Sequence, residues 1–132
     1  YFVERQNEWI THETWTADGE SVVCVNYPGK IMMGDKYGYN FETVFESEHG
    51  YHHPGVSRDK KRFCADRSSG IDEIYYIDKE KNTEITIAKT GDPRNGVEHM
   101  HPSFDRSGTR ILFNNPQEGT NPVVCLFDTA QI

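Results

Sequence analysis

The stretch HPSFDRSG at residues 101–108, with the apolar run ILF at 111–113 after it, occurs in three versions along the chain. The other two are HETWTADG at 12–19 followed by VVCV at 22–25, and HPGVSRDK at 53–60 followed by FCA at 63–65. Each version has a histidine, an apolar residue three positions later, a turn and an apolar run. The versions recur at intervals of more than forty residues, and a period in the forties is typical of propeller blades or another repeat array.

The composition of this 132-residue chain favours a folded domain made of short strands. Aromatic residues make up 12% of the sequence, too many for a disordered chain. No long apolar stripe with helical spacing is present. The clearest predicted strands are 21–25, 41–45, 74–77, 84–88, 110–113 and 123–127. Turns are expected between them, among others at Gly34-Asp35 and Gly91-Asp92-Pro93.

These strands predict an all-β fold of β-propeller blades, each a four-stranded antiparallel sheet. The whole chain, 1–132, is expected to form one partial propeller domain. Its blade-like repeats are predicted at approximately 8–50, 51–94 and 97–132. Propellers close with typically four to eight blades, and three are too few. We therefore expect the remaining blades to come from sequence outside this chain, or self-association to complete the ring.

The net charge argues against two classes of partner. A net charge of −7 argues against a nucleic-acid partner and against an anionic membrane surface. A small anionic ligand stays open, because local arginines or a metal ion override the net field. No apolar stretch approaches the length of a membrane helix. The cysteines, Cys24, Cys64 and Cys125, form no CxxC motif, and we expect buried free thiols. The start at Tyr1 gives no indication of cellular location.

The histidines are the candidate functional residues. Equivalent positions on the innermost strands of a propeller converge on the central channel, which would bring His12, His53 and His101 together. His99 would share a strand face with His101, since residues two apart point the same way. His52 and His53 are adjacent and are expected on opposite faces, so at most one should join the site. His49 is interpreted as structural. Three imidazoles suit Zn, Mn, Fe, Cu or Ni.

Two phrases resemble a known family. THETW at 11–15, closed by Asp18-Gly19, resembles a phrase of the oligogalacturonate lyases, and HMHPSF at 99–104 resembles another. Residues 53–59 resemble the blade between them more weakly. The Asp-Gly hairpin alone is less specific, because it also occurs in TolB-like repeats and ulvan lyases. The resemblance spans nearly the whole chain.

The resemblance implies a seven-bladed propeller that cleaves pectin-derived oligogalacturonides by metal-assisted β-elimination. The family's divalent metal, typically Mn²⁺, is held by three histidines and a glutamine. The histidines carry over onto His12, His99 and His101. The glutamine position holds Gly96, so the fourth ligand would be His53, Asn95, Glu98 or water.

The resemblance also implies which parts of the reaction lie elsewhere. The family's proton-abstracting histidine and its arginine partner precede the THETW phrase, so no catalytic base is expected in this chain. On this reading the chain is the C-terminal, metal-binding part of a lyase and is inactive alone.

Other interpretations remain open. The chain could belong to another uronate lyase, such as an ulvan lyase, with a uronic-acid oligosaccharide still the ligand. It could also be a non-catalytic TolB-like propeller that binds a partner protein or sugar, which Gly96 favours. Four arginines near turns could meet a carboxylate, although a solvated surface role is commoner: Arg58, Arg67, Arg94 and Arg106. Trp15 and Phe104 are repeat-equivalent and are predicted to be core residues.

Overall fold

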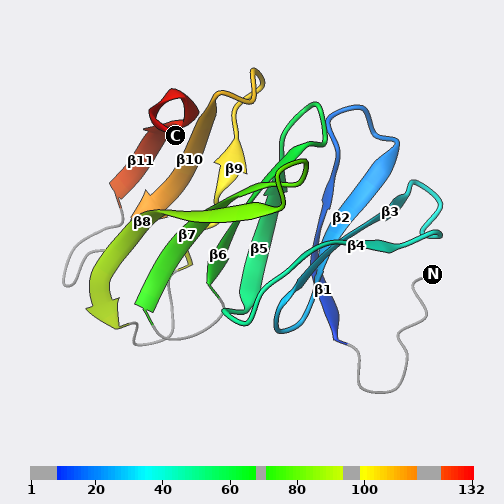
Figure 1. Cartoon of the computed structure of the whole chain (residues 1–132), viewed down its shortest axis with the longest axis horizontal. Helices are drawn as coiled ribbons and strands as arrows, with labels where there is room; N and C mark the ends of the chain where they lie inside the picture. Colours follow the sequence, from blue (N-terminus) through cyan, green and yellow to red (C-terminus); the bar gives the residue numbers. More distant parts are fainter. Residues whose placement is uncertain (1–8, 68–70, 94–98, 116–122) are drawn as a thin grey trace.

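The computed structural model describes residues 9–67, 71–93, 99–115 and 123–132, which form three antiparallel sheets (Figure 1). The strand orders are β1-β2-β3-β4, β5-β6-β7-β8 and β11-β10-β9. The strands are β1 (Ile10–Trp15), β2 (Ser21–Asn26), β3 (Lys30–Asp35), β4 (Glu42–Glu46), β5 (Tyr51–Val56), β6 (Arg62–Arg67), β7 (Ile71–Asp78), β8 (Thr83–Pro93), β9 (Ser103–Phe104), β10 (Arg110–Asn115) and β11 (Val123–Asp128). A short 3₁₀ helix, η1 (Thr129–Gln131), follows β11. The part of the chain that the structure describes has no helix long and apolar enough to cross a membrane.

The first hairpin of each sheet repeats the sequence pattern residue by residue. Trp15, Val56 and Phe104 pair with the first residues of the three apolar runs, Val22, Phe63 and Ile111. The turn between the paired strands repeats as well. Its first residue accepts a hydrogen bond from a backbone N–H on the returning strand: Ser21 to Thr16 Oγ1 (3.0 Å), Arg62 to Ser57 Oγ (3.0 Å) and Arg110 to Asp105 Oδ1 (3.2 Å). The threefold repeat is therefore a repeated hairpin, while the exact limits of the repeats stay a prediction.

Two predicted turns begin later than expected or lie inside a strand. Gly34 still pairs with Val22 in β3, and the turn predicted at Gly34-Asp35 starts at Asp35, whose carbonyl oxygen accepts a hydrogen bond from the N–H of Gly38 at 2.9 Å. Gly91-Asp92-Pro93 ends β8, where Pro93 pairs with Ile71. In both places, ladder pairing with an established neighbour overrides the local preference of glycine, aspartate and proline for turns. The predicted free thiols are confirmed, with Cys24 and Cys64 buried and Cys125 partly exposed.

Two apolar clusters hold the three sheets together. The first lies between the sheets of β1–β4 and β5–β8, and it includes Val23, Ile31, Phe63 and Tyr75. The second joins the sheet of β5–β8 to that of β9–β11 through residues such as Cys64, Ile74, Ile111 and Phe113. Each sheet thus packs one face on the next sheet in sequence order, as successive propeller blades do.

The first strands of the three sheets lie next to one another: β1 packs beside β5, and β5 packs beside β9. Gly55 on β5 permits the close approach of β9. A Cβ atom at this position would lie 2.6 Å from Cys64 Sγ and 2.9 Å from the carbonyl oxygen of Pro102. The absence of a side chain at Gly55 therefore sets the spacing of the strands that carry the histidines.

Replacing Gly55 by alanine is expected to destabilise the fold by about 1–3 kcal/mol, because the added methyl group overpacks the β5–β9 contact. Urea unfolding followed by circular dichroism measures this loss. In the double variant Gly55→Ala/Cys64→Ala the contact with the sulfur is gone, so the two costs should not add. Wild-type stability of Gly55→Ala would show that β9 tolerates a wider spacing.

Candidate metal centre

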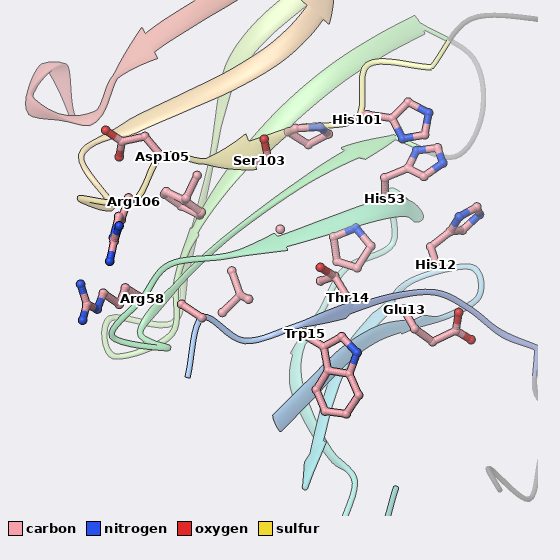
Figure 2. Close-up of a pocket in the computed structure, with 16 residues that line it drawn as sticks. His12, Glu13, Thr14, Trp15, His53, Arg58, His101, Ser103, Asp105 and Arg106 are labelled. Carbon is pink, nitrogen blue, oxygen red and sulfur yellow. The ribbon is translucent and has the colours of Figure 1, made fainter. Parts of the chain in front are cut away.

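Five of the six histidines form one cluster where β1, β5 and the segment before β9 meet. The ring of His53 lies 4.3 Å from that of His12, 5.0 Å from that of His99 and 3.8 Å from that of His101, measured between ring centroids. The ring of His52 lies 4.2 Å from that of His12 and 4.6 Å from that of His99. Figure 2 shows three of these side chains, His12, His53 and His101, gathered at one end of a pocket. The structure thus brings together the three predicted ligands and the candidate fourth, His53.

His49 stands outside this cluster. Its ring stacks on that of Tyr75 with centroids 5.4 Å apart, and its Nε2 atom lies 3.6 Å from a carboxylate oxygen of Glu84. These contacts agree with the structural role predicted for His49.

The expectation that only one of His52 and His53 could join the site is wrong, and a β-bulge is the reason. Tyr51 pairs with Arg67 and Pro54 pairs with Ala65, so both histidines oppose the single residue Asp66. An extra residue in one strand breaks the alternation of side chains between the two faces. Both imidazoles therefore reach the same cluster.

The backbone at two predicted ligands is unusual. His12 has φ 57° and His101 has φ 44°, both in the left-handed region. Non-glycine residues in that region cost about 1–3 kcal/mol and concentrate at functional sites. The shared strand face predicted for His99 and His101 is not present, because β9 begins only at Ser103 and neither residue lies in a strand. Their ring centroids are 5.9 Å apart.

Asp66 on β6 contacts the cluster and is not among the site residues expected from the sequence. Its side chain is fully buried, and its Oδ1 atom accepts a hydrogen bond from the backbone N–H of His53 at 2.7 Å. Its Oδ2 atom lies 2.9 Å from His53 Nδ1 and accepts from the backbone N–H of His101 at 3.1 Å. Burial opposes ionisation here, but these hydrogen bonds and the nearby His53 keep the pKa of Asp66 below its usual value. A carboxylate in this position fixes the ring of His53 with Nε2 available as a ligand atom.

The electrostatics of the cluster favour neutral imidazoles. Burial, reinforced by His53 and His12, lowers the pKa of His52 to about 4. Burial is also the main cause that lowers the pKa of His12, and His53 adds to it. At neutral pH these two rings are therefore uncharged, and each has one nitrogen with a lone pair available for metal coordination.

The donor atoms fit a divalent metal ion. Ligand atoms of His12, His52 and His53 all lie within 4.8 Å of one another, and those of His53, Asp66 and His99 form a second such group. Nitrogen ligands stand about 2.0–2.1 Å from a bound zinc ion, so small side-chain movements bring such a group onto one centre. The two other residues considered for the fourth ligand position, Asn95 and Glu98, lie outside the described residues, as do Gly96 and Arg94.

The pocket next to the cluster has a volume of about 510 Å³ and runs between the inner strands of the three sheets. The histidines stand at one end, and Arg58 and Arg106 stand at the other (Figure 2). Trp15 lines the pocket with 60% of its surface exposed, so its predicted core role is wrong: no described sheet covers that side of β1. Phe104 does pack against the second apolar cluster, as predicted. Arg67 is instead paired with Glu73 at 3.0 Å on the second sheet.

No family model and no curated protein matches the sequence, whereas known structures do. An oligogalacturonate lyase in complex with manganese has a TM-score of 0.73 and 23% identity, over 92% of this chain and 35% of that chain. The oligogalacturonate lyase of Vibrio parahaemolyticus gives 0.69 and 21%, over 95% and 37%. A putative TolB from Agrobacterium tumefaciens gives 0.65 and 18%, over 92% and 43%.

These similarities concern the fold. The chain spans a little over a third of the length of the two lyases. All three sheets are β-propeller blades, as the sequence predicts, and the fold of the chain is similar to part of an oligogalacturonate lyase.

Proposed function

We propose that this chain is the metal-binding part of an oligogalacturonate lyase-like enzyme that acts on uronic-acid oligosaccharides from pectin. The observation that carries the proposal is the convergence of His12, His53, His99 and His101, whose rings lie 3.8–5.9 Å from one another where they are in contact. Similarity of fold to a lyase that binds manganese supports it. Mn²⁺ is the metal we propose for the site.

β-Elimination needs a group that stabilises negative charge on the substrate and a base that removes the proton. The C5 proton of a uronate is too weakly acidic to leave unaided, and a divalent ion on the adjacent carboxylate would stabilise the negative charge that develops. The residues of this chain would hold the ion: the histidines offer ring nitrogens, and the contact with Asp66 orients the ring of His53. The base that removes the proton is proposed to lie outside this chain.

The arginine end of the pocket suits an acidic oligosaccharide. Among the residues that the structure describes, no carboxylate forms an ion pair with Arg58 or Arg106. The two exposed guanidinium groups can each meet a ligand carboxylate, although two carboxylates also line the pocket, Asp105 near Arg106 and Glu13 near His12 (Figure 2). Trp15 offers an exposed aromatic face between the two ends. We propose that this pocket accommodates a chain of uronates, with one carboxylate toward the histidines.

The metal is tested first. The purified chain is expected to bind one divalent transition metal per molecule, because the imidazoles of the cluster lie close together. The triple variant His12→Ala/His99→Ala/His101→Ala is expected to bind none. Elemental analysis and calorimetric titration with Mn²⁺ measure both. His49→Ala serves as the control, since His49 lies outside the cluster. Equal metal content in the wild type and the triple variant would contradict the site and favour a TolB-like binding module.

The substrate is tested by the ultraviolet absorbance of unsaturated uronate products. The assay uses a propeller that contains this chain, with oligogalacturonides and ulvan oligosaccharides compared side by side. Metal-dependent product from oligogalacturonides alone supports the proposal, and product from ulvan alone favours the other lyase.

A further inference from the structure

We propose that His52 is a ligand of the bound metal ion, in addition to the histidines of the repeats. This inference rests on the metal site proposed above. It concerns a residue that the repeat pattern does not single out, since Thr11 and Met100 hold the equivalent positions in the other two repeats. Thr11 is only partly buried, and Met100 is buried in the second apolar cluster.

The distance between His52 and His99 has the value that a shared ion requires. Their Nδ1 atoms lie 3.1 Å apart. Two nitrogens that each stand about 2.1 Å from one ion, at angles of about 90–109°, are separated by about 3.0–3.4 Å. A hydrogen bond between two neutral rings gives a similar distance, with one ring protonated at Nδ1. The two interpretations differ in whether an ion replaces that proton.

The other neighbours of His52 favour the ion. His52 and His53 share one group of ligand atoms with His12, within 4.8 Å of one another. At the angles given above, two ligands of one ion are about 3.0–3.4 Å apart, so a pair at the 4.8 Å limit would need to close by about 1.4–1.8 Å. A hydrogen bond between His52 and His99 does not involve His12, whose ring lies 4.2 Å from that of His52. An ion held by the group of His12, His52 and His53 would use a lone pair from each of these rings.

The bulge on β5 explains how one strand supplies two ligands. His52 and His53 both oppose Asp66, and this aspartate is hydrogen-bonded to His53 and not to His52. His53 is therefore fixed by a carboxylate, whereas His52 is fixed by its contacts with the rings of His12 and His99. The contacts that orient His52 thus come from other residues of the site. We expect the ring of His52 to become fixed when the ion binds.

Calorimetric titration with Mn²⁺ and Zn²⁺ tests the role of His52. His52→Ala is expected to weaken binding at least 10-fold, because loss of a ligand should cost no less than the 10–100-fold cost of losing an outer partner. His52→Asn keeps a neutral oxygen close to the place of Nδ1 and is expected to recover part of this loss. His49→Ala, another histidine removed from the chain, should bind both ions as the wild type does.

Pulsed electron paramagnetic resonance of the Mn²⁺-loaded chain gives a second readout. The number of imidazole nitrogens coupled to the ion is expected to fall by one in His52→Ala and in His52→Asn, and to stay constant in His49→Ala. The asparagine variant thus keeps the test open if His52→Ala does not fold, which circular dichroism reveals. If a folded His52 variant kept the affinity and the number of coupled nitrogens of the wild type, His52 would not be a ligand. Its contact with His99 would then be a hydrogen bond. A wild-type chain that binds neither ion would overturn the proposed function and this ligand together.

Discussion

Asp66→Ala is expected to bind divalent metal about 10–100-fold more weakly than the wild-type chain, as is usual when the partner of a ligating histidine is lost. The variant should also lose about 2–5 kcal/mol of stability. The removed carboxylate accepts the backbone N–H groups of His53 and His101 in a fully buried position. Each buried donor left without a partner costs about 1–3 kcal/mol. Calorimetric titration with Mn²⁺ and urea unfolding measure the two effects.

The matched control is Asp35→Ala. Asp35 also accepts two backbone N–H groups, from Tyr37 and Tyr39 at 2.9 and 3.0 Å, but it does so in an exposed turn. Water replaces the lost acceptor there, so the stability should fall much less and the metal affinity should not change. Asp66→Asn should lie between the wild type and Asp66→Ala, because its amide keeps one of the two oxygens. If Asp66→Ala matched the wild type in both measurements, the geometry of His53 would not depend on the carboxylate.

Phe63→Ala is expected to destabilise the fold by about 3–5 kcal/mol, the usual cost of removing a buried phenylalanine ring. Phe63 is fully buried in the cluster between the first two sheets, where it pairs with Val56 and Ile77. The cavity would loosen the contact that holds β1 beside β5, so metal affinity should fall as well. Urea unfolding gives the stability, and the same titration gives the affinity.

Leu112→Ala is the control for this loss. Leu112 lies on β10 with 44% of its surface exposed, on a face that no described sheet covers. Truncating an exposed side chain usually changes stability by about 0.5 kcal/mol or less. A comparable loss in the two variants would mean that the packing between the first two sheets is not what holds them together.

The fold was largely predictable because its determinants are local. The spacing from Trp15 to Val22, and the matching spacing in the other two repeats, predicted one hairpin per repeat. The strand register confirms these hairpins. β3 gave no usable signal: its residues KIMMGD do not alternate, and glycine and aspartate at its end indicated a turn. Only its pairing with β2 decides that it is a strand.

The site was predictable only in part. The repeat and the two phrases indicated His12, His99 and His101. The alternation of side chains along a strand allowed only one of His52 and His53 in the site, and a bulge breaks that alternation. No local sequence pattern predicts that bulge. Asp66 did leave a signal, because a carboxylate stands in a buried strand where the first repeat has Val25. A charge in that position calls for a buried partner.

The adjacency of β1, β5 and β9 would give a bound metal ion a thermodynamic role apart from any reaction. These strands belong to three different sheets, so an ion held by histidines near all three would bridge both contacts between the sheets. A ligand that binds only the folded chain adds about 2.7 kcal/mol of stability when its free concentration is 100 times its Kd. That is close to the contribution of a large side chain in the core. The stability of the contacts between the blades would then depend on the concentration of free metal ion.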